Sequence, residues 1–224
     1  MSCSRVLPGR WDSLVLDAEP SLDLGFLVSS VDEAFQKYPG RVNPPRNDVF
    51  RAFESLDLED IRVVLIGQDP YPGHGVADGL AFSTRSSKTP ASLLNIHKEL
   101  CAEFGVEKPV RNDLTYLAEQ GVFLYNTSLI SLDGTPLFFS KNPLFALLSR
   151  AVVEAISNRG RAAFILLGRA AQSFEKCVDT AKNCVLKAAH PSPLSAHHGF
   201  FGSGIFSRCN QELEKFGYSP IEWL

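Results

Sequence analysis

The sequence predicts an α/β protein, a three-layer sandwich in which a central four-stranded, mainly parallel sheet is flanked by helices. Short apolar runs alternate along the chain with longer segments whose apolar residues recur at helical spacing. Strands that alternate with helices in this way form parallel sheets covered on both faces. The chain has 224 residues, of which 45% are hydrophobic, enough for a substantial core. We therefore expect one domain over residues 1–224.

The N-terminal quarter of the chain precedes this alternation. Residues 1–24 look irregular, because two prolines and a glycine interrupt them. Helical spacing over residues 26–38 predicts a helix that ends at Pro39-Gly40. A second, shorter helix is expected over residues 49–56.

The alternating part of the chain predicts four strands and four further helices. The strands are expected at residues 61–66, 122–125, 162–167 and 184–188, and the helices at 92–104, 143–157, 170–180 and 207–216. Ser92 is a plausible N-cap for the first of these helices. Asn142 and Pro143 suit the cap and the first helical position of the second.

Polar side chains follow all four predicted strands. Gln68 and Asp69 follow the first strand, Asn126 the second, Arg169 the third and His190 the fourth. Because parallel strands end at the same edge of a sheet, these side chains are expected to meet there. Open α/β sheets bind their ligands at that edge. The sequence therefore predicts one functional site built from distant segments.

Two turns stiffened by proline carry the ionisable groups of this site. Asp69 stands in Gly67-Gln68-Asp69-Pro70-Tyr71, and His190 opens His190-Pro191-Ser192-Pro193-Leu194-Ser195. An aspartate in a loop is commonly a turn former, and a histidine near a strand end is commonly a structural residue. The two prolines of the second turn fix φ and remove two backbone donors, which suits a segment that holds a side chain in place. We therefore favour the functional interpretation of both groups.

Asn126 and Phe82 have two interpretations each. Asn126 is either a turn residue or an amide that offers a donor and an acceptor to a flat polar ligand. Phe82, within residues 79–83, is a core residue by default and otherwise a stacking surface. The His197-His198 pair lacks spaced ligand partners, so we expect no metal site.

Composition and charge indicate in which cellular compartment the protein is expected. Residues 1–60 carry 6 basic and 11 acidic side chains, a balance of −5, whereas residues 61–224 carry 16 and 14, a balance of +2. The five cysteines form no C-x-x-C pair, which is typical of reduced thiols. No apolar stretch approaches the roughly 18 residues of a membrane span, and the first 16 residues lack a secretory pattern. We expect a cytoplasmic or nuclear protein that is not secreted and does not contact a membrane.

Six segments spread over residues 63–223 together resemble the main uracil-excising family of uracil-DNA glycosylases. The two proline-stiffened turns are the most specific of them. The segments are Gly67-Gln68-Asp69-Pro70-Tyr71, Gly79-Leu80-Ala81-Phe82-Ser83, Pro90-Ala91-Ser92-Leu93, Gln120-Gly121-Val122-Phe123-Leu124-Tyr125-Asn126-Thr127, His190-Pro191-Ser192-Pro193-Leu194-Ser195 and Gly199-Phe200-Phe201-Gly202.

The resemblance implies catalytic roles for Asp69 and His190. Asp69 would position the attacking water and stabilise the sugar cation, and His190 would hydrogen-bond uracil O2 as negative charge develops. Asn126 would read the N3 and O4 edge of uracil, Phe82 would stack on its ring, and Gln68 would contact it largely through the backbone. The implied reaction releases free uracil from single- and double-stranded DNA and leaves an abasic site, with no cofactor and no metal.

The resemblance also implies how the remaining site residues meet DNA. Tyr71 would fill the space beside C5, where thymine carries its methyl group. Leu194 would enter the duplex where the base leaves. Phosphate contacts are implied for Pro90, Ser92, Ser192 and Ser195. We expect a monomer, with uracil-containing DNA as its partner and a DNA-mimicking protein inhibitor as a possible second partner.

The sequence departs from the family pattern at several positions. Pro72 stands where most relatives have histidine, and His74 and Asp78 also replace commoner residues. The loop of residues 133–142 lacks the family's Ser-His and Gly-Trp pairs. Arg169 replaces a small polar residue and is either a phosphate contact or a solvated side chain.

These departures leave one alternative open, a catalytically weakened DNA-binding module of the same fold. A nucleotide-binding enzyme is disfavoured, because the chain has neither G-x-G-x-x-G after the first strand nor a Walker loop.

Overall fold

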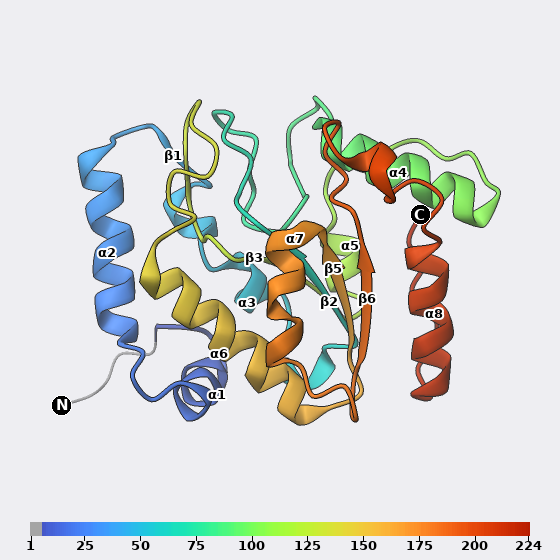
Figure 1. The fold of residues 1–224 in the computed structure, drawn as a ribbon. Coiled ribbons are helices and arrows are strands. Elements are labelled where there is room, and N and C mark those ends of the chain that lie inside the picture. Colours follow the sequence, from blue (N-terminus) through green and yellow to red (C-terminus); the bar gives the residue numbers. More distant parts are fainter. Residues whose placement is uncertain (1–5) are drawn as a thin grey trace.

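A computed structural model describes residues 6–224 and confirms the predicted mixed α/β architecture (Figure 1). Its four-stranded sheet is entirely parallel, with strand order β3-β2-β5-β6. The strands are β2 (Val63–Gly67), β3 (Val122–Asn126), β5 (Ala163–Leu167) and β6 (Cys184–Ala188). The register pairs Gly67 with Asn126 and Leu167 with Ala188, so the strands end at one edge, as predicted. A separate antiparallel pair joins β1 (Val42–Asn43) to β4 (Ser131–Leu132).

Eight α-helices are present among the described residues. They are α1 (Trp11–Ala18), α2 (Leu24–Lys37), α3 (Arg51–Ser55), α4 (Ala91–Phe104), α5 (Thr115–Ala118), α6 (Pro143–Arg159), α7 (Gly168–Gln172) and α8 (Ile205–Lys215). Asn142 caps α6 as predicted, because its side chain accepts a hydrogen bond from the backbone N–H of Leu144 at 2.9 Å. None of the helices within residues 6–224 has the length and apolarity needed to cross a bilayer.

Helices cover both faces of the sheet (Figure 1). On one face, Trp11 of α1 stacks on Phe123 of β3 at 5.2 Å between ring centroids, and Tyr125 hydrogen-bonds Ser149 of α6 at 2.9 Å. On the other face, Leu65 of β2 lies among side chains of α4 and α8. Every residue of β2, β3 and β5 is buried, which explains their continuous apolar runs.

Three local expectations differ from the structure. The segment of residues 1–24, expected to be irregular, contains α1, because Trp11 and Val15 bury one face of a helix against the core. Ser92 does not cap α4; the helix begins at Ala91, and Pro90 occupies the cap position without a side-chain hydrogen bond. The helix expected over residues 170–180 is divided into α7 and a 3-10 turn over Ser173–Cys177.

Candidate active site

A cavity of about 140 Å³ lies at the carboxyl end of the sheet, the upper end in Figure 1. Residues from β2, β3 and the turn after β6 meet around it, together with the first turn of α4. Seven of the predicted site residues line it: Gln68, Asp69, Tyr71, Phe82, Ser92, Asn126 and His190. Arg169 does not line the cavity, and its side chain is exposed to solvent.

One oxygen of the Asp69 carboxylate is held by the protein. The backbone N–H of Leu137 donates a hydrogen bond to Asp69 Oδ2 at 2.9 Å. Burial raises the pKa of Asp69, and the hydrogen bond from Leu137 partly opposes this rise. Oδ1 makes no hydrogen bond to any of residues 6–224, so it is the oxygen left to accept one from a water or a substrate.

The imidazole of His190 is held in one tautomer. The backbone N–H of Ser192 donates to Nδ1 at 3.1 Å, so Nδ1 carries no proton and Nε2–H is the donor. Ser192 lies between Pro191 and Pro193, so its N–H is the one backbone donor left at the centre of this turn. Burial also lowers the pKa of His190, because the charged imidazolium loses water. The site therefore contains a neutral histidine with a directed donor.

Two glycines make room for the amide and the imidazole. A Cβ on Gly67 would lie 2.2 Å from Oδ1 of Asn126, far inside any allowed contact. A Cβ on Gly168 would lie 2.8 Å from Cβ of His190, and its φ of +82° is itself unfavourable for other residues. Close backbone approach at both positions thus lets Asn126 and His190 reach the cavity. Asn126 makes no side-chain hydrogen bond to the described residues, so its amide is free to bind a ligand.

The aromatic wall of the cavity is built from Phe82 and Tyr71. Phe82 has a φ of 63°, in the left-handed region that phenylalanine rarely adopts. The hydroxyl of Tyr71 donates to the backbone carbonyl of Phe82 at 3.0 Å, and burial raises the Tyr71 pKa, so the hydroxyl stays protonated. The rings of Phe82 and His190 lie 5.9 Å apart between centroids. Strained backbone of this kind persists where surrounding contacts fix it, commonly at functional sites.

A buried ion pair supports the strained segment before Phe82. Asp78 accepts hydrogen bonds from the backbone N–H of Leu80 at 3.1 Å and from the hydroxyl of Ser83 at 2.7 Å. Its carboxylate also pairs with Arg51 of α3 at 2.9 Å. These contacts on both sides fix residues 78–83, and with them the Phe82 ring.

The turn after β6 is tied down by its own hydroxyl groups. The hydroxyl of Ser195 donates to the carbonyl of His190 at 2.9 Å, and the hydroxyls of Ser192 and Ser195 are 2.9 Å apart. Asn95 of α4 donates to the carbonyl of Pro191 at 2.9 Å. Leu194 lies beyond these anchors with 92% of its surface exposed, so a rigid base presents a free apolar side chain.

Comparison with known proteins identifies the family. Residues 53–214 match the model of the uracil DNA glycosylase superfamily. The chain belongs to this superfamily. It is 43% identical over 183 residues to the uracil-DNA glycosylase of Azotobacter vinelandii, covering 81% of this chain and 79% of that protein. It is 38% identical over 199 residues to the enzyme of the same name from Borrelia duttonii, covering 88% and 89%.

Solved structures agree on the fold of the superfamily. The crystal structure of mimivirus uracil-DNA glycosylase aligns with a TM-score of 0.87 over 97% of this chain and 87% of that chain, at 21% sequence identity. A mimivirus variant, UNG Y322L, solved in complex with UGI, aligns equally well, over 97% of this chain and 89% of that chain.

The loop of residues 133–142 contributes to the site in a way that the sequence did not predict. Pro136 lines the cavity, and the next residue, Leu137, supplies the amide that holds Asp69. The loop also contacts the turn after β2, because the N–H of Gly134 donates to the carbonyl of Pro72 at 2.8 Å. Both contacts join residues that are distant in the sequence and meet only in the folded structure, so no local sequence pattern predicts them.

Proposed function

We propose that the chain hydrolyses the N-glycosidic bond of deoxyuridine in single- and double-stranded DNA, releasing free uracil and leaving an abasic site. The observation that carries the proposal is the shared cavity, in which a carboxylate, a neutral histidine with a free Nε2–H donor, an unpaired amide and an aromatic ring converge. Membership of the superfamily and the names of the relatives support the same reaction.

The reaction follows from where charge develops. As the bond between C1′ and the base nitrogen N1 breaks, positive charge grows on the deoxyribose and negative charge on the uracil. In the proposed pose Asp69 faces the sugar and Nε2–H of His190 donates to uracil O2. Water attacks C1′ and gives one proton to Asp69, which later releases it to solvent, and the uracil anion takes a proton from solvent. Preorganised donors and charges of this type are typically worth 10²–10³ in rate for each donor.

Base selection rests on the amide and on the wall beside it. In the proposed pose Asn126 Oδ1 accepts from N3–H of uracil, and its NH₂ group donates to O4. Cytosine presents an acceptor and an amino donor at these positions, so both hydrogen bonds are lost. Each buried unmade hydrogen bond costs about 1–3 kcal/mol. Phe82 stacks on the ring, and Gln68, whose carbonyl is already bonded to the N–H of Ser128 at 2.8 Å, is left with its backbone N–H for the base.

The base must leave the duplex to reach this cavity, at a cost of a few kcal/mol. We propose that Leu194 fills the vacated space, because it is the most exposed large apolar residue at the rim. Pro90, Ser92, Ser192 and Ser195 are the proposed phosphate contacts. A protein inhibitor that mimics DNA is a further proposed partner, and a monomer in the cytoplasm or nucleus is the proposed state.

The test is the release of uracil from a deoxyuridine oligonucleotide in the presence of a metal chelator. Wild-type protein is expected to release uracil and leave alkali-labile DNA. Asp69→Asn and His190→Leu should each slow single-turnover excision by at least about 100-fold while changing DNA affinity far less. Well-folded wild-type protein that binds uracil-containing DNA tightly without releasing uracil would instead establish the weakened DNA-binding module, the alternative that Pro72 raises.

A further inference from the structure

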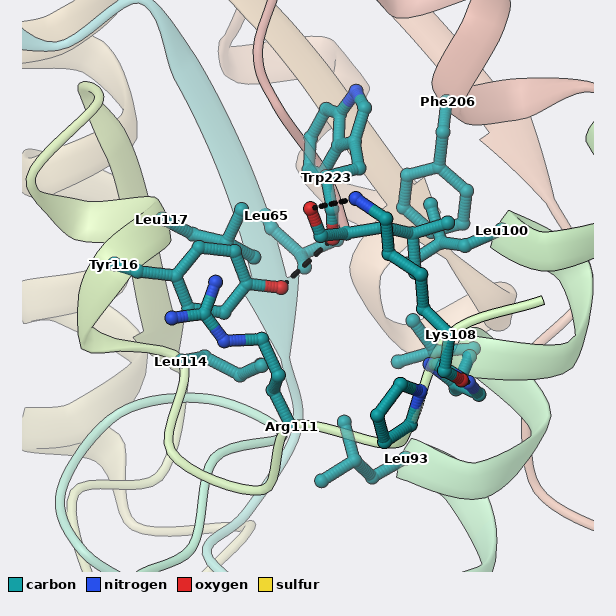
Figure 2. Close-up of a pocket in the computed structure, with 14 residues that line it drawn as sticks. Leu65, Leu93, Leu100, Lys108, Arg111, Leu114, Tyr116, Leu117, Phe206 and Trp223 are labelled. Atoms are coloured by element: carbon teal, nitrogen blue, oxygen red, sulfur yellow. Dashed lines mark hydrogen bonds between the residues drawn. The ribbon is translucent and has the colours of Figure 1, made fainter. Parts of the chain in front are cut away.

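A second cavity lies on the sheet face that α4 and α8 cover, and no residue lines both cavities (Figure 2). Its volume is about 340 Å³, against about 140 Å³ for the candidate active site. Protein interiors are close-packed and contain few voids larger than a water molecule. Pockets that bind drug-sized molecules measure about 300–1,000 Å³. The space is therefore large enough for a small ligand.

The wall of this cavity is mostly hydrocarbon. Side chains from β2, α4, α5, α8 and the C-terminal segment form it, including Leu65, Leu93, Ile96, Leu117, Phe206 and Trp223. Each of these six side chains is otherwise buried in the core. Apolar cavities of this kind stay dry and accept apolar molecules. A ligand that fits the cavity is therefore apolar over most of its length.

The polar groups at the mouth already have partners, with one exception. The hydroxyl of Tyr116 donates to the carbonyl of Trp223 at 2.7 Å, and Lys108 Nζ donates to the carbonyl of Leu224 at 3.1 Å (Figure 2). Nε2 of His97 lies 2.7 Å from the carbonyl of Lys108. These contacts leave little polar capacity for a ligand at the mouth.

Arg111 is the exception. Its guanidinium carbon lies 3.9 Å from the centroid of the Tyr116 ring, and Figure 2 shows it over that ring. Within residues 6–224 it donates no hydrogen bond and forms no ion pair. The neighbouring carboxylate of Asp113 is already engaged, by Thr115 and by Arg51 at 3.7 Å. A stacked guanidinium keeps its N–H edge free, and that edge matches the two oxygens of a carboxylate.

We propose that this cavity binds a small amphipathic carboxylate, whose hydrocarbon chain fills the apolar space and whose carboxylate pairs with Arg111. Lys108 adds a second positive charge at the mouth. The ligand class follows from the lining and the unpaired arginine alone. The proposal does not depend on uracil excision, and binding is measured without it.

Octanoate is the probe, and tryptophan fluorescence is the readout. The chain has two tryptophans. Trp223 lines the cavity, whereas Trp11 is packed on Phe123 at the opposite face of the sheet. Titration with octanoate should therefore give a saturable change from Trp223. Octan-1-ol, which has the same chain and no charge, separates the apolar contribution from the ionic one.

Arg111→Gln is the decisive variant. It should weaken octanoate binding at least about tenfold, the value of one charge-assisted hydrogen bond, and leave octan-1-ol affinity within about twofold. Arg62→Gln is the matched control, because Arg62 also stacks on a tyrosine, Tyr218 at 5.4 Å, and does not line the cavity. Equal octanoate affinities for the two variants would overturn the proposal.

The location of the ligand is tested separately. In the wild-type protein, nuclear Overhauser contacts are expected from the octanoate chain to the methyl groups of Ile96 and Leu117. Leu117→Trp, which fills the cavity, should abolish binding of both probes. Absence of saturable octanoate binding at low millimolar concentration, or contacts only to residues outside the cavity, would refute the site even if the filled variant fails to fold.

Discussion

At the scale of single residues, the two ionisable groups of the site have pKa values shifted toward each other. Burial raises the pKa of Asp69 and lowers the pKa of His190, because each charged form loses water. The hydrogen bond from Leu137 limits the first shift, and the N–H of Ser192 directed at Nδ1 disfavours protonation of the second. An ionised aspartate and a neutral histidine, the pair that the proposed reaction uses, are the forms that these contacts favour at neutral pH.

The sign of these shifts fixes the pH dependence of excision. Protonation inactivates either group, so activity is lost on the acid side. Because the pKa of His190 lies below its ordinary value of 6.5, the neutral imidazole persists through that pH. Single-turnover rates should therefore stay flat from pH 8 to below 6.5, and then fall about tenfold per pH unit for each group that protonates. A decline centred at or above pH 6.5 would show that His190 or Asp69 protonates there, contrary to the forms that the site is expected to hold.

Tyr71 is predicted to exclude thymine through its ring rather than its hydroxyl. One methyl group in a soft pocket gives only about 1–3 kcal/mol of discrimination, so strong rejection needs a rigid wall. Pro70 and the hydrogen bond to Phe82 hold this ring in place. Tyr71→Ala should release measurable thymine from ordinary DNA, whereas Tyr71→Phe should release none. Thymine rejection by an active Tyr71→Ala variant would show that another group excludes thymine from the pocket.

At the scale of elements, the loop of residues 133–142 supports the Asp69 carboxylate. Its Asp133 N–H donates to the carbonyl of Arg41 at 2.7 Å, next to β1. The ring of Phe138 packs edge-on against Tyr38 at 5.6 Å between centroids. Leu137 adopts a φ of 64° between these anchors, and its amide thereby points at Asp69. The backbone of this loop therefore contributes to the site.

Two substitutions at Leu137 distinguish the contribution of its backbone N–H from the contribution of its side chain. Leu137→Gly and Leu137→Ala both keep the N–H, so both should excise uracil within about threefold of wild type. The glycine variant should be about 1 kcal/mol more stable than the alanine variant to urea, because only glycine adopts this φ without strain. A loss of more than tenfold in excision by both variants, with folding intact, would instead show that the half-exposed leucine side chain contacts DNA.

At the scale of the whole molecule, the sequence predicted the sheet because each strand is a short, continuous apolar run. Periodicity was enough for the strands and for α6, whose cap and proline mark its start. It was not enough for α1, where burial of Trp11 against the core decides the structure. The stiff turns predicted Asp69 and His190 at one sheet edge. The approach of Leu137 to Asp69 depends on loop packing over 68 positions of sequence, which no local pattern encodes.

Long-range connections also join the site to the rest of the fold. Glu99 of α4 is 2% exposed, and it accepts hydrogen bonds from the N–H of Gly202 at 2.8 Å and of Gly204 at 3.2 Å. The segment that it holds also meets the end of β6, because the N–H of Ala189 donates to the carbonyl of Gly199 at 3.3 Å. One buried carboxylate therefore links α4, the start of α8 and the residue before His190.

Replacing the Glu99 carboxylate by an amide should lower the free energy of unfolding of the protein. Glu99→Gln keeps the shape of the side chain and replaces one acceptor by a donor that faces backbone N–H groups. We expect a loss of about 2 kcal/mol in the free energy of unfolding, which corresponds to about 4–8 °C in melting temperature for a chain of this size. Glu119→Gln, at the exposed C-cap position of α5, is the matched control and should melt like wild type. Because Glu99 does not line the active-site cavity, excision by the folded variant at low temperature should change less than threefold. An unchanged melting temperature would mean that the amide satisfies this backbone as well as the carboxylate does.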